Sequence, residues 1–175
     1  VIIGSSILVL VVVALDILKV IFIGDPEYWQ AMYIVPIILL ANFCLGIYQN
    51  LSVWYKVTDM TKFAAYISGV GAIITLLLNI ILIPNYSILG SAVATLIAYF
   101  TMALLSYIIG KKHYPIPYNT SKILFYILLS ICLSSISFYG FRDNILVGIV
   151  CILVMNLVIL VKEKRQIIKL FNLIR

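Results

Sequence analysis

Charged residues are scarce in this 175-residue chain. Lys, Arg, Asp and Glu together make up only 10% of it, whereas 65% of the residues are hydrophobic and the mean hydropathy is +1.21. Both properties lie far outside the range of soluble globular domains. A soluble helical core is disfavoured, because its helices would each need one polar face.

Residues that could carry out chemistry are also few. The chain has 3 cysteines and 1 histidine. Cys44, Cys132 and Cys151 stand apart in apolar segments without CxxC spacing, which disfavours a disulfide framework or a zinc site. His113 has no carboxylate near it in sequence, and the chain shows no paired acidic motif and no nucleotide-binding glycine loop. We therefore expect no metal, no cofactor and no enzymatic activity.

Long apolar runs, in contrast, fill most of the chain. A helix rises about 1.5 Å per residue, so about 20 apolar residues cross a hydrocarbon core about 30 Å thick. This length predicts an all-α polytopic membrane protein with six transmembrane helices, at residues 1–23, 31–54, 63–83, 87–109, 122–140 and 145–161. The short connection at Pro84, Asn85 and Tyr86 predicts a tight antiparallel hairpin.

Small residues recur on the two helices of this predicted hairpin. They are Ala64, Ser68 and Ala72 on the first, and Gly90 with Ala94 and Ser91 with Thr95 on the second. Small faces let helix backbones approach each other in lipid. We therefore expect the two helices to pack closely through these faces.

Basic residues gather in every second connection. Ten of the 12 Lys and Arg residues lie in the second and fourth connections or after the sixth segment. Because basic residues near helix ends stay on the cytoplasmic side, this pattern predicts a multi-pass membrane protein with both termini of the chain cytoplasmic. The net charge of +6 has the same origin and does not require nucleic acid as a partner.

The last residues combine apolar and basic side chains. Helical spacing relates Ile167, Leu170, Phe171 and Ile174, with basic residues opposite them. This pattern is typical of an amphipathic helix on the anionic inner leaflet. We therefore expect residues 162–175 to form a basic cytoplasmic tail.

The predicted hairpin carries a known motif. Residues 79–95, Asn-Ile-Ile-Leu-Ile-Pro-Asn-Tyr-Ser-Ile-Leu-Gly-Ser-Ala-Val-Ala-Thr, resemble the LNxxLIPxYGIxGAAxAT signature of the multidrug, oligosaccharidyl-lipid and polysaccharide exporter superfamily. Residues 35–41 and 45–56 resemble its Wzx-type oligosaccharide flippase branch, in the C-terminal lobe. Ser87 stands where the family usually has glycine, and Ser91 stands where it often has alanine.

The resemblance implies a two-lobed, MATE-like transporter whose lobes face a central cavity. Residues 1–110 would supply four helices of the C-terminal lobe, and residues 111–161 two further helices. An N-terminal lobe is expected upstream, in a longer parent chain.

A flippase function follows from the same resemblance. It implies that a polyprenyl-diphosphate-linked oligosaccharide crosses the inner membrane by alternating access, for polysaccharide or O-antigen (lipopolysaccharide) biosynthesis. The expected partners are this substrate, membrane lipids and the upstream lobe. Two alternatives stay open: a cation-coupled multidrug exporter of the same superfamily, and a membrane-embedded glycan polymerase or acyltransferase. The last would normally place catalytic residues in a sizeable loop, and no such loop is visible.

Four amides could line the implied cavity. A sugar headgroup must exchange its water shell for side-chain hydrogen bonds, and Asn and Gln both donate to and accept from hydroxyls. Asn42, Gln49 and the adjacent Asn50 lie near one another at helical spacing on the second segment, and Asn79 lies near the hairpin turn. The alternative is that these amides join neighbouring helices by hydrogen bonds.

Two charged residues in the first segment, and a group of aromatic and basic residues after the second, are further candidates for the functional site. Asp16 and Lys19 lie inside the first segment at a spacing that lets them pair, so Asp16 is either an ion-pair partner or a titrating group that couples transport to a cation. Trp54, Tyr55 and Lys56 would either anchor the helix at the membrane interface or line the inner vestibule.

Overall fold

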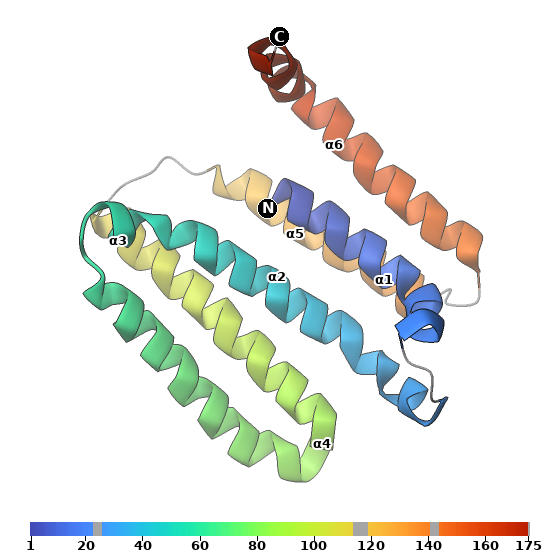
Figure 1. The fold of residues 1–175 in the computed structure, drawn as a ribbon, viewed down its shortest axis with the longest axis horizontal. Coiled ribbons are helices and arrows are strands. Elements are labelled where there is room, and N and C mark those ends of the chain that lie inside the picture. The colour runs from blue at the N-terminus through green and yellow to red at the C-terminus, as the bar shows by residue number, and fades with distance from the viewer. Residues whose placement is uncertain (23–25, 114–118, 141–143, 175) are drawn as a thin grey trace. The chain divides into compact units, whose positions relative to one another are not determined.

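The computed structural model describes the backbone of residues 1–22, 26–113, 119–140 and 144–174, and their side chains except those of 22, 26–28, 30, 145 and 165–174. These residues form helices throughout (Figure 1), in the order α1 (Ile2–Phe22), η1 (Pro26–Ile34, a 3-10 helix), α2 (Val35–Leu51), α3 (Val53–Val57), α4 (Lys62–His113), α5 (Thr120–Ser135), η2 (Ile136–Gly140, a π-helix) and α6 (Ile145–Ile174). The predicted all-α class is therefore confirmed for this part of the chain.

Long apolar helices make up most of the structure. Within the described residues, 5 helices are long and apolar enough to cross a membrane: Ile2–Ile21, Ala31–Val57, Lys62–His113, Thr120–Gly140 and Leu146–Lys164. Their outward faces carry large apolar side chains, and Ile3, Ile80 and Leu146 are all well exposed. A surface of this kind is unfavourable in water and suits lipid. The structure is thus consistent with a multi-pass membrane protein.

The helices divide into two compact units. Unit 1 joins residues 1–25 to residues 120–175, and therefore contains α1, α5, η2 and α6. Unit 2 is the intervening stretch, residues 26–119, with η1, α2, α3 and α4. Within unit 1, α1 contacts both α5 and α6, and within unit 2, α2 lies along α4.

In unit 2, α4 is a folded-back pair of helical limbs. Its 52 residues would reach about 78 Å if straight, more than twice the thickness of a bilayer core. Ser87 interrupts the helix with φ 48° and ψ −127°, close to Pro84, which has no backbone N–H to donate. Figure 1 shows the two limbs running side by side from this break. The predicted hairpin is present, and its turn is a single non-helical residue.

The two limbs of α4 approach most closely at glycines. A Cβ on Gly90 would lie 2.6 Å from the backbone oxygen of Leu82, and a Cβ on Gly71 would overlap the side chain of Met102. Gly90 and Ala94 are buried, as expected of a packing face.

The first limb differs from the prediction. Ser68 and Ala72 are exposed, whereas Ile67 and Gly71 are buried. The packing face is therefore rotated by about one residue, or about 100° around the helix. The side chain of Ile67 is fully buried in the core of unit 2 and fills space that a face of small residues alone would leave empty. This accounts for the rotation of the first limb toward Ile67 and Gly71.

Unit 1 is held by an apolar core between its three helices. Val9 of α1, Tyr126 of α5 and Cys151 with Met155 of α6 are buried together. A Cβ on Gly148 would lie 2.5 Å from Cγ1 of Val13, so α6 needs glycine where it meets α1.

The ends of two helices differ from the predicted segments. α6 continues as one helix of 30 residues to Ile174, beyond the predicted end at residue 161. The Lys and Glu residues that follow are good helix formers, so polarity did not end the helix. The apolar side chains predicted to form the amphipathic tail, from Ile167 onward, lie outside the described side chains. The predicted second segment corresponds to the apolar span Ala31–Val57, in which α2 ends at Leu51, α3 begins at Val53, and Ser52 between them keeps helical backbone angles (φ −70°, ψ −12°).

Candidate functional site

The exposed side of α2 carries the predicted cavity amides. Asn42, Gln49 and Asn50 are all exposed, whereas Ala41, Cys44 and Tyr48 are buried against the rest of unit 2. At 100° per residue, Asn42 and Gln49 point within about 20° of each other, and Asn50 lies about 80° from Asn42. The structure therefore leaves three amides uncovered by unit 2 on one side of a helix long enough to span a membrane.

Two of these amides also bond to their own helix. Nδ2 of Asn42 donates to the carbonyl oxygen of Ile38 at 3.1 Å, and Nδ2 of Asn50 donates to that of Gly46 at 2.9 Å. A carboxamide has two N–H donors and a carbonyl acceptor, so one bond of this kind uses only part of its capacity. Hydroxyls of a bound sugar, water or a polar group from another helix could use the rest.

Asn79 lies in a different setting, on the first limb of α4. Its side chain is half-buried, and its Oδ1 is buried without a hydrogen-bond partner among the described residues. A buried amide oxygen left unpaired costs about 1–3 kcal/mol, so this atom is a place where a donor from outside the described residues would be stabilising.

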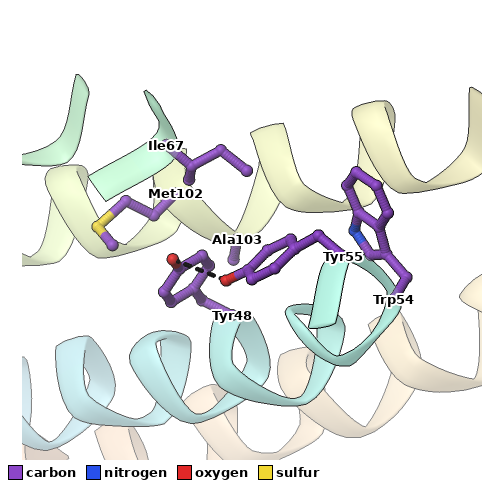
Figure 2. Packing of buried hydrophobic residues seen from close by; sticks show 6 residues of the cluster. All are labelled: Tyr48, Trp54, Tyr55, Ile67, Met102 and Ala103. Carbon is purple, nitrogen blue, oxygen red and sulfur yellow. Dashed lines mark hydrogen bonds between the residues drawn. The ribbon is translucent and has the colours of Figure 1, made fainter. Parts of the chain in front are cut away.

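Trp54 and Tyr55 are buried inside unit 2. Only 3% of Trp54 and 2% of Tyr55 is exposed, and both pack with Tyr48, Ile67 and Met102 (Figure 2). The hydroxyl of Tyr48 shares a hydrogen bond with the hydroxyl of Tyr55, at 3.1 Å, as Figure 2 shows. These two rings therefore face the interior of unit 2.

Tyr48, Ser52 and Tyr55 are all buried at helical spacing, because the backbone at Ser52 stays helical (φ −70°, ψ −12°) between α2 and α3. At Ser52 the chain leaves α2, and its Oγ donates to the carbonyl oxygen of Gln49 at 2.6 Å. Tyr48 on α2 also shares a bond at 3.3 Å with the hydroxyl of Ser68 on α4. The buried hydroxyls of Tyr48 and Tyr55 and the exposed hydroxyl of Ser68 thus bond to one another and tie α2 and α3 to α4.

An aromatic stack joins α3 to both ends of α4. The ring of His113 stacks on Trp54 with centroids 5.8 Å apart and an interplanar angle of 14°, and its centroid lies 4.9 Å from that of Phe63. Gly110 lies beneath the indole, where a Cβ would come within 2.7 Å of Trp54 Nε1. Lys56, in contrast to Trp54 and Tyr55, is exposed at this end of unit 2.

Asp16 and Lys19 form the ion pair that their spacing allows. Nζ of Lys19 lies 2.5 Å from Oδ1 of Asp16, and 20% of the Lys19 side chain and 37% of the Asp16 side chain are exposed. Pairing lowers the cost of keeping two charges within an apolar span. The pair belongs to unit 1, whereas the other predicted site residues belong to unit 2, so the structure does not assemble all of them into one site within a unit.

Glu163 is a buried carboxylate that sequence reasoning missed. It is 4% exposed, Nζ of Lys122 lies 2.5 Å from its Oε1, and the hydroxyl of Tyr126 donates to the same oxygen at 3.0 Å. Its Oε2 is buried without a hydrogen-bond partner among the described residues. Nearby, Nζ of Lys162 lies 3.4 Å from the centroid of Phe125.

These groups could bind polar or anionic molecules. The described residues contain no cluster of three or more His, Cys, Asp or Glu side chains that could hold a metal ion. Comparison of the sequence with protein-family models and curated proteins, and of the structure with solved structures, gives no match. The family resemblance therefore rests on the motif residues themselves, and the function is a proposal.

Proposed function

We propose that this chain is the C-terminal part of a flippase that moves a polyprenyl-diphosphate-linked oligosaccharide across a bacterial inner membrane. The reaction is transport by alternating access, with no covalent chemistry. The oligosaccharide headgroup crosses through a polar cavity, while its polyprenyl tail stays in lipid. The proposal places the chain in polysaccharide or O-antigen assembly.

The exposed amide side of α2 is the observation that carries this proposal. Asn42, Gln49 and Asn50 interrupt an otherwise apolar surface. Each hydrogen-bonding group of an amide that faces hydrocarbon without a partner costs about 1–3 kcal/mol, and the bonds of Asn42 and Asn50 to their own helix leave such groups unpaired. This side of α2 is therefore stable in a membrane only if it faces a water-filled cavity or another protein segment. A cavity shared with an N-terminal lobe satisfies this requirement and supplies donors and acceptors for sugar hydroxyls.

The proposed topology has six membrane passes. The two limbs of α4 cross separately, because a helix of 52 residues that reverses at Ser87 cannot be a single pass. With the second connection, at residues 58–61, on the cytoplasmic side, the lysines that flank it also lie there. The Ser87 turn then faces the opposite side, where the adjoining sequence from 63 to 110 contains no Lys or Arg. Both ends of the chain are cytoplasmic in this arrangement.

The decisive experiment uses the intact parent protein in its host. Deletion of the gene should cause the lipid-linked oligosaccharide to accumulate on the cytoplasmic leaflet, and the intact gene should reverse this. Normal glycan export combined with increased sensitivity to cationic drugs would reject the flippase proposal and favour multidrug export.

Variants of α2 connect the phenotype to the amide side. We expect Asn42→Leu combined with Gln49→Leu to reduce flipping at unchanged protein levels, because it removes two hydrogen-bonding groups and keeps an apolar helix surface. Ile38→Ala is the matched control, since Ile38 is an exposed apolar residue of the same helix. Equal flipping in the double variant and the control would show that these amides do not serve the substrate.

A further inference from the structure

All basic residues of unit 2 lie at one end of it. Lys56 belongs to α3, Lys62 begins α4, and Lys111 and Lys112 lie in the last turn of α4. All four side chains are exposed. In Figure 1 the end of α2, α3 and both ends of α4 meet here, with the turn of α4 at the other end of unit 2. These four lysines form the lysine patch.

The aromatic stack beneath the lysine patch holds its lysines close together. His113 contacts both Trp54 and Phe63, and these three rings come from three different segments of the chain. Lys62 directly precedes Phe63 and Lys112 directly precedes His113, so each lysine Cα is about 3.8 Å from the Cα of a stacked residue. The stack thus brings lysines far apart in sequence onto one surface.

The charge of the lysine patch is unbalanced. Asp59 is the only acidic residue between positions 50 and 113, so the surface carries an excess of positive charge. Nζ of Lys62 lies 5.8 Å from the centroid of Phe63, a weak cation–π contact that leaves the ammonium accessible. Clustered like charges repel one another, and an anion that bridges them removes this cost.

The surroundings of the lysine patch favour a lipid as this anion. The patch lies at the ends of helices long enough to span a membrane, which is the depth of phospholipid headgroups. Val53, Val57 and Ile108, at the same end of unit 2, expose large apolar side chains that suit acyl chains. Lysine ammoniums bind phosphate as point charges. We propose that the lysine patch binds the phosphodiester headgroup of anionic phospholipids.

This binding site is independent of the proposed transport function. It requires only that the helices span a membrane, and the amide side of α2 takes no part in it. A chain that binds anionic lipid but flips no oligosaccharide would therefore support this inference and reject the proposed function.

A local fluorescence reporter can test the site in the full chain. The sequence has 2 tryptophans, so Trp29→Phe leaves Trp54, beneath the lysine patch, as the single emitter. The protein in a neutral detergent is titrated with phosphatidylglycerol, with phosphatidylcholine and with inorganic phosphate. Native mass spectrometry of the same samples counts the bound lipids and provides a second readout.

We expect saturable binding of phosphatidylglycerol and little binding of phosphatidylcholine. Lys62→Gln combined with Lys112→Gln should weaken the binding roughly 25-fold at low salt, since one lysine contributes about fivefold at an anionic surface. The control is Lys162→Gln combined with Lys164→Gln, which removes two exposed positive charges from unit 1 and should leave the affinity at Trp54 unchanged.

Four results would overturn the inference. Equal binding of phosphatidylcholine would show that headgroup charge is not recognised, and equal losses in the two double variants would show only a response to net charge. Displacement of the lipid by millimolar inorganic phosphate would show a site for free phosphate instead. If neither fluorescence nor mass spectrometry detects a difference between the lysine-patch variant and the parent, the patch does not bind lipid.

Discussion

Replacing Ser87 with glycine should stabilise the chain. Ser87 has φ 48° and ψ −127°, a backbone conformation that glycine adopts readily and that places the Cβ of any other residue too close to its own backbone. Holding a non-glycine residue in such a region costs about 1–3 kcal/mol. Glycine removes this strain but adds about 0.5–1 kcal/mol of unfolded-chain entropy. The net gain in the free energy of unfolding therefore lies between about 0 and 2.5 kcal/mol.

Reversible unfolding in mixed detergent micelles, followed by loss of helical circular dichroism, measures this gain. Ser87→Ala is the matched control, because it removes the exposed hydroxyl and keeps the Cβ that causes the strain. Asp59→Gly is a second control at a positive φ of 55°, where aspartate is tolerated better than most residues, and we expect a smaller gain there. Equal stabilities of Ser87→Gly and Ser87→Ala would refute the strain argument.

Three further predictions concern packing and buried polar groups, all measured by the same unfolding assay. Gly90→Ala should lower the free energy of unfolding by about 1–3 kcal/mol, because its Cβ would meet the backbone oxygen of Leu82. The control Gly69→Ala should be neutral or stabilising, because a Cβ there has nothing within 4 Å. Similar losses at the two glycines would contradict the packing argument. Glu163→Gln should lower the free energy of unfolding by about 1–3 kcal/mol; this is less than the loss expected when a fully buried ion pair is broken, because 31% of the Lys122 side chain is exposed. The double variant Glu163→Leu with Lys122→Met leaves no unpaired charge and should recover most of this loss. Tyr126→Phe should cost about 1.5–3 kcal/mol, since it removes a donor to the Glu163 carboxylate, and an unchanged stability would show that this bond contributes nothing net.

The sequence was sufficient to predict the helices and the reversal of α4. Apolar runs of span length are a strong signal, and Pro84 within one of them marks an interruption. The predicted second segment corresponds to the apolar span Ala31–Val57, where the backbone stays helical at Ser52 between α2 and α3. A membrane segment ending at residue 161 and a helical tail after it were predicted separately, and in the structure both belong to the continuous α6, whose polar residues also favour helix formation.

The candidate site was predictable only in part. The periodicity of α2 places Asn42 and Gln49 on one side, which helical geometry alone determines. The burial of Glu163 was not predictable, because an acidic residue between Lys162 and Lys164 is typical of an exposed helix end. Its burial depends on Tyr126, which is 37 residues away in sequence and is positioned by the packing of α5 on α6.

The inward orientation of Trp54 also depended on tertiary structure. Sequence alone left two exposed roles open, an interfacial anchor or a lining of the vestibule. The distant His113 and Gly110 provide a surface for the indole, and no local pattern indicates that they come together.

The split of unit 1 along the sequence has a consequence for biosynthesis. α1 packs on α5 and α6, yet unit 2 is synthesised between them. At about 5–20 residues per second, the roughly 100 residues from α1 to α5 take on the order of 5–20 s to emerge. During this time unit 2 can already close its hairpin, whereas α1 waits in the membrane with its half of the unit 1 core exposed to lipid or to the insertion machinery. Assembly of this chain is therefore expected to proceed from the middle of the sequence outward.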